Sequence, residues 1–290
     1  MPEAITATIG WSTHAEAEHA GREAAHRAME QLSTRRAQLA LVFGSSWFDQ
    51  LPLLQGVRSV LHDLPLAGES TAGEITPEGP TSHSCVVVLL AASAMTCSVG
   101  IGEAVDQHPR EAGQRAAYTA LQTLHSPSRV GLLLFGDGLV KNYAEVVRGL
   151  QEVLGTSSLI VGGMAGDDLR FRRTYQYAHD RVVSRAVIGV LLGGAVKMSA
   201  GIEHGFSPIS RPRRITRAQA NVLFELDHHP AASVYQEYFG EDIVQQIQEE
   251  GLTRRTAAYP LGMQDSPTDP WLLRNVVSFG AEGSLVCSGE

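Results

Sequence analysis

Cysteine is scarce in this sequence of 290 residues, and Cys85, Cys97 and Cys287 are odd in number and lack C-x-x-C spacing. These properties exclude a disulfide framework and a thiolate zinc site, so we predict buried free thiols. The longest apolar run, residues 86–92, is far shorter than the roughly 20 residues that span a bilayer. Residues 1–10 lack the features of a secretory signal, so the sequence predicts a cytoplasmic protein without a membrane span.

Positive charge is limited, because 23 Lys and Arg residues stand against 31 Asp and Glu residues, for a net charge of −8. No block of basic residues occurs, although Arg211, Arg213, Arg214 and Arg217 make one segment locally basic. This balance argues against a nucleic-acid partner. The composition is that of an ordinary globular chain, and at about 150 residues per domain the length suggests two domains.

The usual catalytic signatures are also missing. Residues 68–72 (Gly-Glu-Ser-Thr-Ala) lack the second glycine of a G-x-S-x-G elbow, and no P-loop, H-E-x-x-H or C-x-x-C-H motif occurs. The sequence therefore predicts a protein that is not an enzyme and needs no cofactor. A hydrolase that uses Ser70 or Asp167 is an alternative, and it requires a base within hydrogen-bond reach of the nucleophile.

What the sequence does contain is an internal repeat. Residues 20–28 (AGREAAHRA) recur at 112–120 (AGQRAAYTA) with five of nine positions identical, and both segments are typical of helices. Short apolar strands follow at 41–44 and 133–136. Further matching segments are amphipathic helices at 51–61 and 143–154, glycine-rich segments at 66–75 and 160–169, and strand pairs at 85–90 with 95–101 and 186–192 with 196–202.

The repeat sets the predicted fold. Alternating strands and helices favour an α/β fold with a parallel or mixed sheet, helices packed on it and a hairpin at the end of each repeat. We predict a first domain over residues 1–220, built from repeats at about 5–95 and 96–195, and a second segment over 221–290. The rest of the chain is expected to hold helices at 216–226 and 230–240 and a hairpin of 272–279 with 284–287.

The two glycine-rich segments, 68–74 and 162–168, are the strongest candidates for a ligand site. Glycine lets a ligand approach the backbone closely, and loops at the carboxyl ends of strands bind ligands in open α/β sheets. Each segment also ends in carboxylates, Glu74 in the first and Asp167-Asp168 in the second. Tight connections with solvated acidic ends are the structural alternative.

Histidine offers one further candidate. His204 follows a predicted strand, where a neutral imidazole could bind an anionic ligand or ligate haem iron, although a structural role is the simpler interpretation. His228 and His229 precede Pro230 at a predicted helix start, which suggests a capping or surface role.

Several motifs occur in an order that resembles the FIST domain family (F-box and intracellular signal transduction). They are VFGSS at 42–46, GESTAGEI at 68–75, VGGMAGDD at 161–168, EHGF at 203–206 and ELDHHPA at 225–231. The resemblance covers the N-terminal domain of the family over roughly residues 30–220 and the start of its C-terminal domain over 225–290.

The resemblance implies a non-catalytic sensory protein that binds a small ligand, such as an amino acid or a small carboxylate. It implies signalling through a separate histidine kinase, cyclic-di-GMP enzyme or chemotaxis receptor. A haem-binding nitric-oxide sensor with His204 as iron ligand is the alternative it suggests. The ligand-binding residues that it indicates are Ser70, Thr71, Gly73, Glu74, Gly162, Gly163, Gly166, Asp167, His204 and Gly205.

Two features depart from the family pattern. His228 and His229 stand where the family commonly has a glycine turn, and family members usually extend well beyond the match to residues 283–289. We therefore expect most of the C-terminal domain to be missing, and a homodimer could compensate for the lost interface.

Overall fold

The structure is a computed structural model that describes residues 5–33, 35–140, 143–240, 242, 258–266 and 268–289. The chain divides into two compact units, Met1–Gly201 and Ile202–Glu290, and each is described by itself. The predicted α/β class is confirmed, because helices pack on sheets that contain both parallel and antiparallel pairs. None of the described helices is both long and apolar enough to cross a membrane.

The first sheet of the N-terminal unit has the strand order β1-β6-β2-β3-β10-β11, in which only β2 and β3 are parallel. Its strands are β1 (Thr6–Ser12), β2 (Leu39–Ser45), β3 (Leu66–Thr71), β6 (Cys85–Ala91), β10 (Gln176–Ala178) and β11 (Arg181–Val183). The helices α1 (Ala17–Glu30) and α2 (Gln50–Leu61) connect β1, β2 and β3. A small hairpin of β4 (Glu74–Thr76) and β5 (Gly79–Thr81) precedes β6.

The second sheet has the order β7-β12-β8-β9, in which only β8 and β9 are parallel. Its strands are β7 (Met95–Glu103), β8 (Arg129–Asp137), β9 (Ile160–Ala165) and β12 (Ala186–Gly194). The helices α3 (Pro109–Thr123) and α4 (Tyr143–Leu154) connect β7, β8 and β9.

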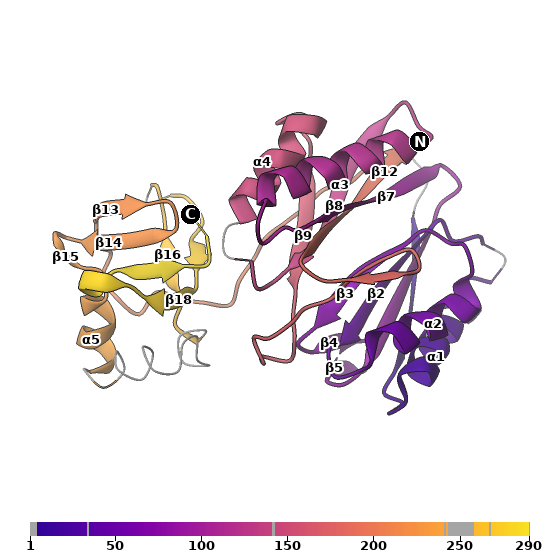
Figure 1. Ribbon diagram of the computed structural model, residues 1–290, viewed down its shortest axis with the longest axis horizontal. Helices are drawn as coiled ribbons and strands as arrows, with labels where there is room; N and C mark the ends of the chain where they lie inside the picture. Colours follow the sequence, from indigo (N-terminus) through magenta and orange to yellow (C-terminus); the bar gives the residue numbers. More distant parts are fainter. Residues whose placement is uncertain are drawn as a thin grey trace. The chain divides into compact units, whose positions relative to one another are not determined.

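The N-terminal unit has four layers, with the two sheets face to face and helices outside (Figure 1). Alternate residues of each strand point to opposite faces. Thus Leu66 of β3 joins the core under α1 and α2, while Ala67 joins a core that both sheets share. Phe43 of β2 and Phe135 of β8 meet there with ring centroids 6.1 Å apart.

The two halves of this unit share one strand order and one mode of helix packing. A Cβ atom added to Gly21 of α1 would lie 2.1 Å from the Leu53 carbonyl oxygen of α2. A Cβ atom on Gly113 of α3 would lie 2.3 Å from the Val146 carbonyl oxygen of α4. Each helix pair therefore depends on a glycine at its closest contact. These likenesses agree with the repeat, and the duplication itself stays a prediction.

The predicted strands and helices of both repeats are confirmed up to residue 194, but the predicted hairpins are wrong. Strand β6 pairs with β1 and β2, whereas β7 pairs with β12. Residues 92–94 thus carry the chain from one sheet to the other instead of turning it back on itself. The second expected hairpin does not form either, because residues 196–202 are not a strand.

The C-terminal unit holds a sheet of order β13-β14-β19-β18, with β15 paired to β14. Among its described residues the elements are β13 (Ile215–Gln219), β14 (Val222–Leu226), β15 (His229–Pro230), α5 (Ser233–Phe239), β16 (Leu261–Met263), β17 (Leu272–Arg274), β18 (Val276–Phe279), a 3₁₀ turn (Ala281–Gly283) and β19 (Leu285–Cys287). The helix predicted at 230–240 is confirmed as α5. The predicted C-terminal hairpin is confirmed for β18 and β19, whereas β17 pairs with β16.

The helix predicted at 216–226 is wrong. This segment forms β13 and β14, joined by a tight turn at Ala220 and Asn221. Ala and Gln favour helix locally, but β14 also pairs with β19, about sixty residues further along the chain. Pairing over such a distance leaves no local trace in the sequence, and here it outweighs helix propensity.

Candidate functional site at the ends of β3 and β9

The candidate site lies at the carboxyl ends of β3 and β9. Each of these strands runs parallel to one neighbour in its own sheet, β3 to β2 and β9 to β8. In α/β sheets ligands bind outside the carboxyl ends of the strands, which is why the sequence points to these segments as a candidate ligand site. The two glycine-rich segments are less loop-like than predicted, because β3 continues through Thr71 and β9 through Ala165. Only the residues after these strands form connecting loops. We call residues 69–71 and 162–168 together the strand-end site.

Direct hydrogen bonds join the two strand ends. The Gly166 N–H donates to the Ser70 carbonyl oxygen at 2.8 Å, and the Ser70 hydroxyl donates to the Gly166 carbonyl oxygen at 2.6 Å. The Asp168 N–H donates to the Thr71 carbonyl oxygen at 3.3 Å. The structure therefore brings Ser70, Thr71, Gly166 and Asp167 into one place, as the sequence predicted for these segments.

The carboxylates of Asp167 and Asp168 are both hydrogen-bonded within the protein, Asp167 to backbone N–H groups and Asp168 to side-chain hydroxyls. Asp167 accepts hydrogen bonds from the N–H groups of Phe171, Arg172 and Arg173, at 2.9, 2.6 and 3.1 Å. Asp168 accepts from the hydroxyl groups of Ser45 and Ser46, at 3.0 and 2.5 Å. The local sequence, with an acidic residue followed by a short loop, favours such turns.

Glu74 has the same kind of environment. Its carboxylate accepts hydrogen bonds from the Thr71 hydroxyl and from the N–H and hydroxyl groups of Ser84, the latter two at 3.1 and 2.5 Å. Glu74 is buried at the start of β4, and Gly73 turns the chain into this strand with φ at +138°. Both residues thus shape the connection that follows β3.

Glu69 is the buried acidic residue that sequence analysis missed. Its side chain is only 7% exposed, and its Oε2 atom has no hydrogen-bond partner among the described residues. Burial raises the pKa of the Glu69 carboxyl from 4.5 to about 8, and a hydrogen bond from the Gly136 backbone opposes this shift more weakly. The raised pKa favours the protonated form of Glu69, which can both donate and accept hydrogen bonds.

The register of β3 explains this position. Ala67 and Glu69 lie on the face that meets the second sheet, while Leu66 lies on the face under α1 and α2. A polar residue in phase with the buried Ala67 is the signal that could have identified Glu69. Its neighbours in the first sheet are Phe43 on β2 and the buried Gln176 on β10.

On the side of the second sheet, Gly163 of β9 lies next to Glu69. A Cβ atom on Gly163 would lie 3.6 Å from the Glu69 Oε1 atom. Gly162 and Gly163 are exposed, and β9 is the outermost strand of its sheet. The strand-end site thus combines a buried carboxyl, whose Oε2 atom has no hydrogen-bond partner among the described residues, with exposed backbone beside it.

Comparison with known proteins agrees with this description. Residues 38–229 match the FIST N domain. The chain belongs to the FIST family. FIST is a family of sensory domains in signal transduction, which is consistent with the prediction that the protein is not an enzyme. The FIST match ends near the start of α5, so the predicted C-terminal FIST segment stays a prediction.

One relative of this FIST protein is an uncharacterized protein of Methanocaldococcus jannaschii. The two are 32% identical over 114 residues, which is 37% of this chain and 22% of the relative. The chain therefore spans less than a quarter of that relative's length.

The remaining predicted site residues of the FIST protein, His204 and Gly205, belong to the C-terminal unit. The exposed His204 ring lies with Nε2 3.1 Å from the Trp271 carbonyl oxygen, and Nδ1 accepts a hydrogen bond from the Phe206 N–H at 3.3 Å. Both ring nitrogens are thus occupied by backbone groups. This arrangement adds no support to the haem alternative.

The environment of Ser70 adds no support to the hydrolase alternative. Its hydroxyl donates to the Gly166 carbonyl oxygen and accepts from the Tyr175 N–H at 2.9 Å. Within the described part of the chain, the hydrogen bonds of this hydroxyl therefore involve backbone groups rather than a general base.

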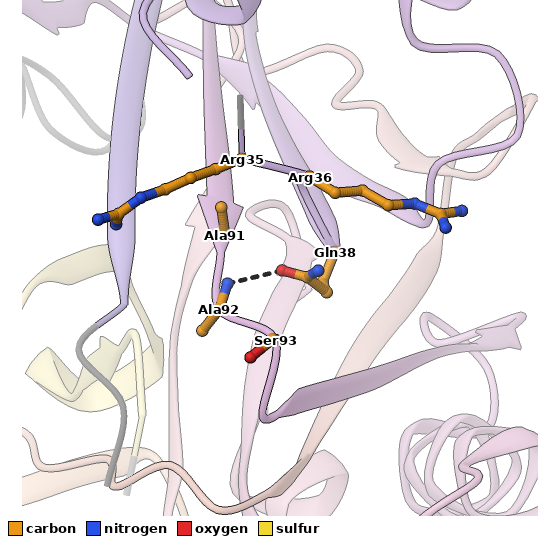
Figure 2. A pocket seen from close by; sticks show the side chains of 6 residues that line it. All are labelled: Arg35, Arg36, Gln38, Ala91, Ala92 and Ser93. Carbon is orange, nitrogen blue, oxygen red and sulfur yellow. Dashed lines mark hydrogen bonds between the residues drawn. The ribbon is translucent and has the colours of Figure 1, made fainter. Parts of the chain in front are cut away.

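A separate hollow of about 240 Å³ lies beside the end of β6 (Figure 2). Gln38 lines this hollow, and its Oε1 atom accepts a hydrogen bond from the Ala92 N–H at 2.6 Å. In Figure 2 the guanidinium groups of Arg35 and Arg36 point in opposite directions, so they do not converge on one anion. This hollow is therefore a weaker candidate than the strand-end site.

Proposed function

We propose that this FIST protein is a sensor whose strand-end site binds a small amino-acid-like molecule. The observation that carries the proposal is the Glu69 Oε2 atom, which is buried without a hydrogen-bond partner among the described residues. An unsatisfied buried polar atom costs about 1–3 kcal/mol, and a ligand that satisfies it recovers this energy. Functional sites are where folds retain such costs.

The chemistry of Glu69 favours an amino acid over a purely apolar molecule. With its pKa raised to about 8, the carboxyl can donate a hydrogen bond to a ligand carboxylate. Its deprotonated form would pair with a ligand ammonium group. The exposed backbone of Gly162 and Gly163 offers further N–H and C=O groups to a small zwitterion.

The signal would pass to a separate protein. A histidine kinase, a cyclic-di-GMP enzyme and a chemotaxis receptor are the partner classes that we propose. The hydrogen bonds between Ser70 and Gly166 connect the two sheets next to Glu69. A ligand that binds at Glu69 would therefore change the contact between the sheets rather than a single exposed loop, and this change would be the signal. Such a contact can shift the balance between two arrangements.

A thermal-shift screen tests this function. The wild-type chain is incubated with the amino acids and with small carboxylates, and a ligand at a hundred times its Kd is expected to stabilise the fold by about 2.7 kcal/mol. Glu69→Gln is expected to weaken, by about tenfold or more, the binding of any compound that stabilises the wild type. Glu78→Gln is the matched control, because Glu78 is exposed in the turn between β4 and β5.

Two results would contradict the proposal. The first is that none of these compounds stabilises the wild-type protein. The second is that Glu69→Gln binds the stabilising compound as tightly as the wild type does, which would place the ligand elsewhere on the molecule.

A further inference from the structure

Two histidines and a glutamate gather where the chain enters α1. His14 and Glu16 lie between β1 and α1, and His19 lies in the first turn of the helix. Each offers one possible ligand atom, and these three atoms lie within 4.8 Å of one another. All three residues are exposed, so an ion could reach them from solvent. The ring centroids of His14 and His19 are 5.0 Å apart.

From this geometry we propose that His14, Glu16 and His19 form a binding site for a divalent transition-metal ion such as Zn²⁺ or Ni²⁺. Imidazole nitrogen and carboxylate oxygen are common ligands of these ions at about 2.0–2.2 Å. His19 Nδ1 and Glu16 Oε2 are already 2.8 Å apart, close to the separation of two ligands on one ion. Water would complete the coordination, because the cluster is open to solvent.

Hydrogen bonds around the cluster partly set its shape before an ion binds. The Glu16 N–H donates to His14 Nδ1 at 3.1 Å, and the His14 N–H donates to the Ser12 hydroxyl at 3.1 Å. Ser12 in turn donates to Glu23 of α1. Partners of this kind orient the ligands of metal sites and strengthen binding, and the bond to His14 Nδ1 persists when the ion binds Nε2 of that ring.

Binding requires a proton to move. If His19 is neutral, the proton on its Nδ1 atom moves to Nε2 of the same ring and the ion takes its place; if the ring is charged, it keeps the proton on Nε2 and releases the one on Nδ1 to water. If the ion uses His14 Nδ1, the Glu16 N–H bonds to water instead, which is accessible at this surface. A bound ion would tie the connection after β1 to the first turn of α1.

Isothermal titration of the full chain with ZnCl₂ tests the site. We expect one ion to bind in the wild type, and His14→Ala and His19→Ala each to weaken this event about tenfold or more. His26→Ala is the matched control, because His26 is exposed on the same helix but outside the cluster. It is expected to bind as the wild type does.

The site is refuted if the His14→Ala/His19→Ala double variant binds zinc as tightly as the wild type. It is also refuted if His26→Ala loses as much affinity as either cluster variant. Circular dichroism would show that each variant is folded, and the exposure of all these side chains makes that the expected result.

Discussion

Ser70 and Gly166 are joined by two hydrogen bonds, in which each residue is both donor and acceptor. The Gly166 N–H reaches the Ser70 carbonyl oxygen at 2.8 Å, and the Ser70 hydroxyl reaches the Gly166 carbonyl oxygen at 2.6 Å. Ser70 lies at the end of β3 and Gly166 follows β9, so these bonds connect the two sheets. One backbone hydrogen bond and one from the Ser70 side chain therefore set the spacing between the strand ends.

Gly166→Ala is therefore expected to destabilise the fold. The added Cβ atom would lie 2.7 Å from the Ala72 nitrogen, and the strand ends would have to separate. We expect a loss of about 1–3 kcal/mol in the free energy of unfolding, measured by urea denaturation. Gly201→Ala is the control, because no atom lies within 4 Å of its added Cβ. Equal stability of the two variants would show that the strand ends can separate freely.

Glu69 is expected to make stability depend on pH. Below pH 4.5 the carboxyl is protonated in both the folded and the unfolded chain. Between 4.5 and about 8 the unfolded chain loses this proton while the folded chain keeps it, so stability falls as pH rises, by at most about 1.4 kcal/mol per pH unit. Above that range this effect is complete.

The measurement compares wild type with Glu69→Gln by urea denaturation across this pH range. As pH rises, the free energy of unfolding of wild type is expected to fall relative to that of Glu69→Gln. Glu78→Gln, a substitution at an exposed position, is the control. A difference that stays constant with pH would mean that burial does not raise the pKa of Glu69.

The two helix pairs are expected to respond alike to the same substitution. In an exposed helix Gly→Ala adds about 1 kcal/mol of stability, but at Gly21 and Gly113 the new Cβ atom would meet backbone oxygens at 2.1 and 2.3 Å. We expect each variant to lose about 1–3 kcal/mol, read from urea denaturation. A stabilised Gly113→Ala beside a destabilised Gly21→Ala would argue against equivalent packing in the two halves.

Tyr177→Phe is expected to cost about 1–3 kcal/mol, because it leaves a buried acceptor without its donor. The Tyr177 hydroxyl donates to Gln50 Oε1, and both residues are buried. Tyr118→Phe serves as the control, since Tyr118 is 59% exposed. Thermal denaturation of the two variants should show a lower Tm for Tyr177→Phe alone.

Local pattern was enough to predict the strands and helices that the two halves of the N-terminal unit share, but not the short hairpins β4–β5 and β10–β11. The alanine-rich segment around Ala24 and the apolar run at 41–44 have periodicities that short-range geometry dictates. The sheet to which each strand belongs depends on distant pairing. Strands β6 and β7 are adjacent in the chain and separated by a short link, yet they lie in different sheets.

Local pattern also predicted part of the candidate site. Glycine-rich segments after apolar strands pointed to the ends of β3 and β9, and the structure joins Ser70 to Gly166 there. Glu69 escaped notice because its importance comes from burial by the opposite sheet and by β10. The alternation that places Glu69 in phase with the buried Ala67 is a local signal, but the burial itself depends on tertiary packing.

The β10–β11 hairpin has a consequence for the order of events during synthesis. Residues 176–183 are made after β9, but they cover the edge of β3, which was made about a hundred residues earlier. Until that hairpin leaves the ribosome, the nascent first half carries an open strand edge of the kind that recruits other chains. A fragment that stops at residue 94 is therefore expected to self-associate through the open edge of β3. A fragment extended to residue 201 is not expected to do so, because β10 covers that edge.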